Sequence, residues 1–182
     1  MTYSFSVRLH VGGEKRDPTL FRLLNSSKFS VFDINLRAPH YEVDCVLDLM
    51  KKSHLVKMNE EELTLLVKHF GYEISDPEKM VRRMAKVCGL KIFCVTLGEK
   101  GALLLKGKQI HKHEGYCVEV EDTVGAGDNF LAGMIYKYLL KRKGSEILEF
   151  ACAAGALAAT KKGSPPNISK QNIDDFIEQN KV

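Results

Sequence analysis

The sequence predicts an α/β protein: a mostly parallel sheet covered by helices on both faces. Short apolar runs typical of buried strands alternate along the chain with longer amphipathic segments typical of helices. At 182 residues, with 45% hydrophobic and 27% charged residues, the chain has an ordinary globular composition and the length of one domain. We therefore expect a single α/β domain over residues 1–182.

The first half of the chain alternates strand and helix. Apolar and polar residues alternate over 5–11, which predicts a strand ending at Gly12-Gly13. Asp17-Pro18 supplies an N-cap and a first-turn proline, so a helix should follow to about Leu24. The same patterns predict strands at 29–35 and 54–58 and helices at 43–52 and 60–70.

The second half continues the alternation. Asp76-Pro77 opens a helix that should run to about Cys88, and a buried strand follows at 91–97. Gly107 separates two short strands, which predicts a hairpin. The remaining expected elements are the hairpin strands 102–105 and 109–113, a strand at 117–121, and helices at 128–142, 146–162 and 170–180.

Charge, cysteines and hydropathy exclude several classes. The net charge is +4, but the 27 basic residues are scattered, so we expect no nucleic-acid partner. The five cysteines form no C-x-x-C pair and lie in apolar segments, which indicates reduced core residues. No apolar run approaches the roughly 18 residues that span a membrane, and no signal peptide opens the chain. We expect no membrane partner and a cytoplasmic location.

Polar residues follow several of the expected strands. They are Asp33 and Asn35, Asn59, the turn from Thr96 to Gly98, and the loop 122–128. Ligands of parallel sheets bind beyond the carboxyl ends of the strands, so we expect these four clusters at one edge, in a single site.

Residues 122–133, Asp-Thr-Val-Gly-Ala-Gly-Asp-Asn-Phe-Leu-Ala-Gly, are the most informative stretch. Glycines allow backbone amides close to a ligand, and the first turn of a helix offers free amides and partial positive charge. That arrangement suits a phosphoryl group, and Asp128 beside it could accept a proton from a hydroxyl. A glycine loop with Asp as N-cap is also an ordinary helix start. Taken alone, Gly125-Ala126-Gly127-Asp128 therefore leaves both a structural and a functional interpretation open.

Two other phosphate motifs are excluded. The chain contains no G-x-x-x-x-G-K-[ST], so it is not a P-loop protein. Gly125-Ala126-Gly127 begins like a dinucleotide fingerprint, but Phe130 stands where the third glycine belongs.

The whole stretch resembles the second signature of the ribokinase-like (PfkB) carbohydrate kinases. The resemblance implies a three-layer ribokinase-like fold, Asp128 as catalytic base, and an anion hole formed by the amides of Gly125, Ala126 and Gly127. It also implies ATP and Mg²⁺ as cofactors, with a sugar and a nucleotide as small-molecule partners.

Two further motifs match the family's nucleotide site. Asn59 and Glu62 fit its Asn-x-x-Glu, which implies that Asn59 binds ATP and that Glu62 holds Mg²⁺ through water. The same pair is also an ordinary capping box, and both roles can coexist. Thr96, Gly98 and Gly101 fit the T-L-G-x-x-G that lines the ATP site, although a plain glycine turn explains that pattern too.

Phe32 to Arg37 resembles bacterial fructokinases and their 2-keto-3-deoxygluconate kinase relatives, which favours a sugar over a nucleoside. Arg37 could bind a phosphate or a substrate carboxylate, or form a surface ion pair. A monovalent-cation site, for K⁺, is implied at Asp122, Val124, Ala158 and Gly163, although Asp122 could simply cap the turn. Cys152 departs from the family, where a polar residue near the adenine is usual.

The resemblance covers the catalytic C-terminal portion of such a kinase. The family's N-terminal part and its β lid have no counterpart in this sequence. We therefore expect an exposed sheet edge that favours self-association. The expected function is transfer of the γ-phosphate of ATP to a sugar hydroxyl. The short chain itself is expected to be either active or inactive as a kinase. The alternative is a catalytically silent nucleotide-binding or interaction module; a nucleoside kinase is disfavoured.

Overall fold

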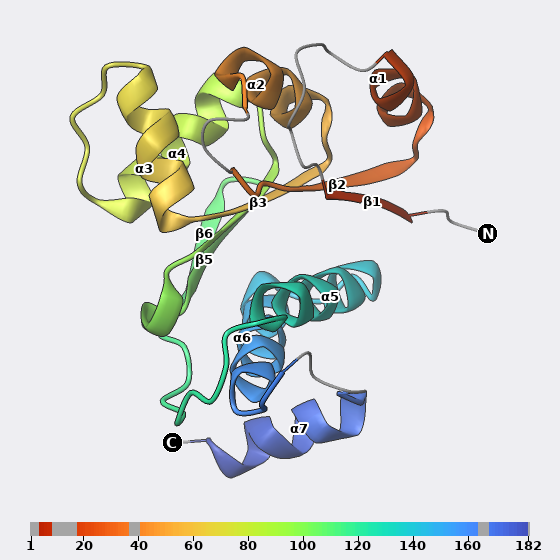
Figure 1. Ribbon diagram of the computed structural model, residues 1–182, viewed down its shortest axis with the longest axis vertical. Helices are drawn as coiled ribbons and strands as arrows, with labels where there is room; N and C mark the ends of the chain where they lie inside the picture. The colour runs from red at the N-terminus through yellow and green to blue at the C-terminus, as the bar shows by residue number, and fades with distance from the viewer. Residues whose placement is uncertain (1–3, 9–17, 37–40, 164–167, 182) are drawn as a thin grey trace. The chain divides into compact units, whose positions relative to one another are not determined.

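The computed structural model describes residues 4–8, 18–36, 41–163 and 168–181, in which strands alternate with helices (Figure 1). The strands are β1 Ser4–Arg8, β2 Phe29–Asp33, β3 Leu55–Asn59, β4 Ile92–Thr96, β5 Ala102–Lys106 and β6 Gln109–His113. The helices are α1 Pro18–Ser26, α2 Val43–Lys52, α3 Glu60–His69, α4 Pro77–Cys88, α5 Ala126–Leu139, α6 Gly144–Ala159 and α7 Lys170–Gln179, with a 3-10 turn η1 at Gly98–Lys100.

The chain forms two compact units, and the β5–β6 hairpin contributes to both. Unit 1 consists of residues up to Thr96 together with 105–110. Unit 2 consists of 97–104 and the residues from His111 onward. The chain therefore passes from one unit to the other three times, after Thr96, Leu104 and Ile110. The single domain expected over 1–182 stays a prediction.

Among the described residues the strands follow one another in the sheet in chain order, from β1 to β6. Strands β1 to β4 are parallel, so their carboxyl ends lie at the same edge. The register places Asp33 beside Lys57 and Asn59 beside Thr96. Strands β2 to β4 are mostly apolar and mostly buried, which is typical of parallel sheets.

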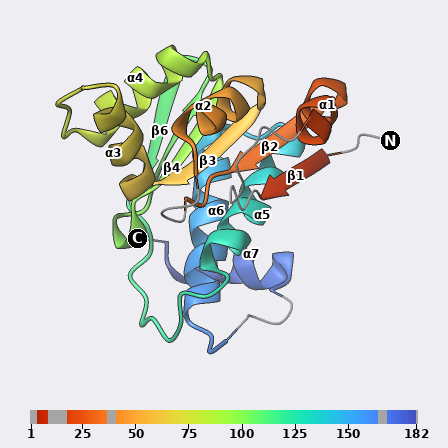
Figure 2. The ribbon, with the colours of Figure 1, turned by 45° about the horizontal axis from the view of Figure 1, so that its top comes forward.

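Helices α1 to α4 of unit 1 lie on one face of strands β1 to β3 (Figures 1 and 2). Helix α4 shows why the sequence signals were reliable. The Asp76 side chain accepts the Lys79 amide at 2.9 Å, Pro77 follows, and Gly89 at φ 68° ends the helix in the left-handed conformation. Its buried residues are Met80, Val81, Met84, Ala85 and Cys88.

In unit 2, small residues bring α5 and α6 close together. A Cβ added to Gly133 would lie 3.2 Å from the Ala154 Cβ, and one added to Gly155 would lie 3.3 Å from the Ala126 carbonyl oxygen. Glycine at both positions therefore allows the two helices to approach closely, and a larger residue would require the neighbouring atoms to shift. Helix α7 completes the packing through a buried cluster formed by Phe150, Ala153, Ala154, Ile173 and Ile177.

The predicted strand at 117–121 is wrong. These residues form no strand, and the Val120 side chain is 57% exposed. The amides of Glu121 and Asp122 both donate to the Ala159 carbonyl, at 2.9 and 3.2 Å, so the segment is tied to the end of α6. The alternation of apolar and polar residues is real, but the apolar side has no core to face.

Other boundaries differ by up to three residues. Helix α5 begins at Ala126 rather than Asp128, and it ends before Lys141, whose φ of 57° is incompatible with a helix continuing to Arg142. The predicted strand residues 9–11, Gly12-Gly13 and the Asp17 cap lie outside the described residues. Throughout the described ranges, no helix has both the length and the apolar character that crossing a membrane requires.

Candidate active site

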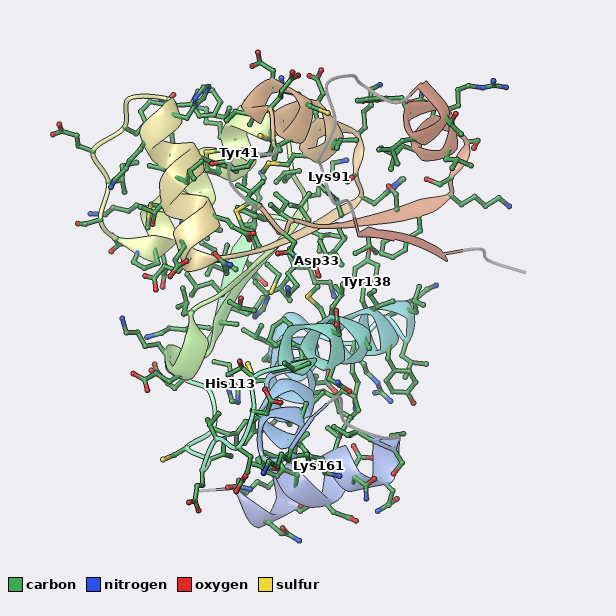
Figure 3. The ribbon with its side chains drawn as sticks, viewed as in Figure 1. Asp33, Tyr41, Lys91, His113, Tyr138 and Lys161 are labelled. Atoms are coloured by element: carbon green, nitrogen blue, oxygen red, sulfur yellow. The ribbon has the colours of Figure 1, made fainter. Side chains whose placement is uncertain are left out.

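A buried ion pair in unit 1 joins Asp33, the last residue of β2, to Lys57 in the middle of β3. The Lys57 Nζ lies 2.8 Å from the Asp33 Oδ1, and the two side chains are 9% and 3% exposed (Figure 3, which labels Asp33). Charges are retained in such an interior position only when they are paired. The pair marks this edge of the sheet as polar.

Asn59 and Thr96 lie side by side at the same edge, as the last residues of β3 and β4. The Thr96 hydroxyl is 3.5 Å from the Met58 carbonyl. Asn59 is also the N-cap of α3, and its side chain accepts the Glu62 amide at 2.8 Å. Two predicted ATP-binding residues and the predicted magnesium residue are therefore neighbours in unit 1.

The Glu62 carboxylate is 6% exposed and binds two backbone amides. Its Oε2 accepts the Asn59 amide at 2.9 Å, and its Oε1 accepts the Leu36 amide at 2.8 Å. Burial raises the pKa of the Glu62 carboxyl above its ordinary 4.5, while the two amides and the Lys57 ammonium act in the opposite direction.

Each Glu62 oxygen keeps one further lone pair, so the carboxylate could still hold a metal-bound water. Within the described residues, no group of three or more His, Cys, Asp or Glu could bind a metal ion. Mg²⁺ needs no such cage, because it keeps several waters and uses few protein ligands. The residues present therefore fit Mg²⁺ held through water. Arg37 lies outside the described residues, one position after Leu36.

In unit 2, the glycine turn leads directly into α5. Gly125 is the N-cap at φ 80°, a left-handed conformation that favours glycine. Asp128 occupies the first turn of the helix and is exposed, as is Gly127. The Ala126 amide donates to the Thr123 carbonyl at 3.2 Å, which closes the turn. Of the three amides predicted to form the anion hole, Ala126 is thus already engaged.

Asp122 ties this turn to the end of α6. Its Oδ1 accepts the Val124 amide at 2.9 Å, and its Oδ2 accepts the Gly163 amide at 3.1 Å. The Ala158 carbonyl accepts the Lys161 amide at 3.1 Å. The four residues predicted for a monovalent cation thus surround one junction, but the Asp122 and Ala158 oxygens already accept backbone N–H groups.

The turn predicted to line the ATP site is tightly closed. Gly98 and Gly101 have φ of 63° and 83°, and the Leu97 amide donates to the Gly101 carbonyl at 2.8 Å. A Cβ on Gly101 would lie 1.9 Å from the His113 carbonyl oxygen. Gly101 is therefore required for the close approach of two backbone segments within unit 2.

The predicted polar edge is confirmed in part. Asp33, Asn59 and Thr96 end three neighbouring strands of unit 1, whereas the loop 122–128 follows no strand. Sequence reasoning missed Lys57 as a member of this edge. Its signal is a charged residue within the apolar run of β3, at the position that matches Asp33 in β2.

The pfkB family carbohydrate kinase model matches residues 9–171 of this chain. The ribokinase of Haemophilus influenzae is 29% identical over 134 residues, which cover 72% of this chain and 43% of the relative. The fructokinase of Solanum tuberosum is 30% identical over 148 residues, covering 78% and 43%. The chain thus spans about half the length of the curated relatives it matches.

The crystal structure of a fructokinase from Vibrio cholerae O395, in fructose, ADP and calcium ion bound form, matches with a TM-score of 0.80. The match covers 97% of this chain and 61% of that chain at 24% identity. This likeness confirms the predicted ribokinase-like α/β fold.

Proposed function

Since this chain belongs to the pfkB family of carbohydrate kinases, we propose that its protein transfers the γ-phosphate of ATP to a hydroxyl group of a sugar. The observation that carries the proposal is the exposed Asp128 carboxylate in the first turn of α5. This helix begins directly after Gly125, which has the left-handed conformation. A proton acceptor and a helix N-terminus that favours negative charge are the two things this reaction needs.

In the proposed reaction, Asp128 takes the proton of the attacking sugar hydroxyl. The amides of Gly125 and Gly127 and the positive end of the α5 dipole stabilise the charge that spreads over the transferred phosphoryl group. The Ala126 amide can join them only by leaving the Thr123 carbonyl, to which it donates in this structure.

The nucleotide is assigned to the remaining predicted residues. Asn59 and Thr96 end neighbouring strands of unit 1, and Gly98 and Gly101 form the turn that follows. Mg²⁺, when bound, neutralises phosphate charge, and Glu62 would hold it through water. A potassium ion near Asp122, Val124, Ala158 and Gly163 is a further part of the proposal.

We assign the acceptor to the sugars, with fructose as the first candidate. Support comes from the Solanum tuberosum fructokinase among the relatives and the fructose-bound Vibrio cholerae structure among the fold neighbours. Arg37 is the residue proposed to bind a phosphate or an acidic group of the substrate.

An Asp128→Asn variant tests the proposal. Its amide side chain accepts no proton at neutral pH, so turnover in a coupled assay with a panel of sugars should fall at least about a thousandfold. Calorimetry should show unchanged Mg-ATP binding. Glu146→Gln is the matched control, because Glu146 occupies the corresponding first-turn position of α6. Wild-type turnover in Asp128→Asn would refute the assigned base.

A second candidate is a catalytically silent nucleotide-binding module. The observation that favours it is the closed turn before α5, in which the Ala126 amide donates to the Thr123 carbonyl at 3.2 Å and is not free for a phosphoryl group. Calorimetry separates the two functions: Mg-ATP binding with no response to any sugar favours the module. Self-association through the outer edge of β1, the first strand in the sheet order, is a related proposal that sedimentation velocity would test.

A further inference from the structure

The connection between β2 and the β3–α3 segment continues beyond the end of β2 through a side chain. Asp33 lies beside Lys57 in the parallel register, and the Ile34 amide donates to the Lys57 carbonyl at 2.8 Å. In a parallel ladder every second amide donates to the same neighbour, so the next donor would be Leu36 and its acceptor the Asn59 carbonyl.

Asn59 is the N-cap of α3, so the chain leaves the strand there. An N-cap carbonyl ordinarily accepts the first hydrogen bond of its own helix. The Leu36 amide donates instead to the Glu62 Oε1 at 2.8 Å. The opposite oxygen, Oε2, accepts the Asn59 amide at 2.9 Å. A single carboxylate therefore joins the chain that leaves β2 to the chain that leaves β3.

The site is built to keep this arrangement. Glu62 is 6% exposed, and its backbone is fixed by the bond from its own amide to the Asn59 side chain at 2.8 Å. A charged acceptor makes a stronger bond to an amide than a carbonyl does. The buried pair of Asp33 and Lys57 joins the end of β2 to β3, two residues before β3 ends at Asn59.

We propose that Glu62 is a positioning residue that supplies the missing rung of the ladder and fixes the path of Asn35 and Leu36 beyond β2. This inference rests on the proposed function, since Arg37, the candidate for binding phosphate or substrate, follows Leu36 directly. Glu62 thus fixes the chain leading to Arg37 against the start of α3, where Asn59 is assigned to the nucleotide. The role is additional to holding a metal-bound water.

We call the two bonds from the Leu36 and Asn59 amides to the Glu62 carboxylate the clamp. Amide hydrogen exchange of Leu36, followed by NMR, tests the clamp directly and needs no kinase activity. Glu62→Gln should accelerate exchange at Leu36 about tenfold to a hundredfold, because a neutral amide oxygen replaces a charged acceptor and can serve only one of the two donors. Glu62→Asp keeps the charge but is one methylene too short to reach both amides, so it should have the same effect.

The control is Glu61→Gln, which removes an exposed carboxylate from the same helical turn and should leave Leu36 unchanged. Exchange in β4 reports whether each variant is folded. Wild-type protein adds a check that needs no substitution: its Leu36 amide should be protected. Fast exchange there, or wild-type rates in both Glu62 variants, would overturn the clamp.

A second measurement separates positioning from charge and from metal. Binding of ATP is followed by calorimetry in EDTA, where no metal-bound water contributes. If Glu62 acted only through its charge, Glu62→Gln would bind the ATP tetra-anion more tightly than wild type. Positioning predicts the opposite sign, with both Glu62 variants weaker by about threefold to tenfold. Unchanged or tighter binding would refute positioning. A wild-type chain that binds no ATP either in EDTA or with Mg²⁺ would refute the proposed function and leave the exchange result to decide the role of Glu62.

Discussion

The Lys57 ammonium and the Asp33 carboxylate form an ion pair of 2.8 Å between neighbouring parallel strands, and both side chains are almost fully buried. Removing two charges from water is costly, and their attraction offsets that cost only while both partners are present. The pair therefore makes the end of β2 and the middle of β3 depend on each other.

Breaking this pair should destabilise the protein strongly. Lys57→Met removes the ammonium that faces the buried Asp33 carboxylate, and Asp33→Asn removes the negative charge that faces Lys57; each should lower the free energy of unfolding by about 3–5 kcal/mol. The double variant should lose less than the sum of the two. Urea denaturation measures all three. The exposed pair of Lys51 and Asp48 is the control, and Lys51→Met should cost at most about 1 kcal/mol.

Gly101→Ala should disrupt the start of the β5–β6 hairpin. The new Cβ would lie 1.9 Å from the His113 carbonyl oxygen and 2.4 Å from the Gly115 amide nitrogen, at a φ of 83°. Backbone atoms cannot move aside cheaply, so we expect a loss of about 3 kcal/mol or more in urea unfolding. Gly98→Ala is matched to it, because its φ of 63° is similarly left-handed but its Cβ would meet nothing within 4 Å. That variant should lose only about 1 kcal/mol, and equal losses would contradict the clash.

His113 should make stability depend on pH. Burial lowers the pKa of its ring below the ordinary 6.5, with Glu149 and Glu114 opposing, and its Nδ1 accepts the Gly115 amide at 3.0 Å. Below pH 6.5 the unfolded chain binds a proton that the folded protein resists, so this group's contribution is present above pH 6.5 and is lost as pH falls toward the folded pKa.

The measurement is thermal unfolding between pH 7.5 and 5.5. His113→Asn keeps an acceptor atom at the δ position but does not titrate, so its loss of stability over that range should be smaller than that of wild type. Parallel curves for the two proteins would show that the ring does not resist protonation.

One thiol should react with Ellman's reagent far faster than the others in the folded protein. All five cysteines are thiols outside any disulfide, and Cys117 is the exposed one among them, which corrects the expectation that every cysteine is a core residue. Burial raises the pKa of the Cys152 thiol to about 12 and raises that of Cys88 above 9.0. Cys117→Ser should remove the fast phase, and Cys88→Ser should leave it intact. A fast phase that survived Cys117→Ser would contradict this assignment.

Local signals were sufficient for most elements of the fold. Asp76-Pro77 marks the start of α4 and Gly89 marks its end. A cap, a first-turn proline and a left-handed terminal glycine each act on the few residues beside them, so they can be recognised in the sequence. The strand expected at 117–121 does not form, since a short apolar segment becomes a strand only when a neighbouring strand and a core are available. That information lies elsewhere in the chain.

The candidate site likewise contains contacts that the sequence predicted and contacts that it did not. The adjacency of Asn59 and Thr96 was predictable, because residues that end parallel strands meet at one edge of the sheet. The bond from Leu36 to Glu62 was not, because it depends on the register of β2 against β3 and on where α3 begins. The closure of the turn by Ala126 and Thr123 is likewise a matter of backbone conformation that residue types alone leave open.

The three passages of the chain between the units, after Thr96, Leu104 and Ile110, restrict how the protein can be dissected. A protease cut at any one of these points would leave at least one unit divided between two fragments. Neither unit can therefore be expressed as one uninterrupted stretch of this sequence, and a split-protein or domain-swap experiment would have to carry residues 97–110 whole.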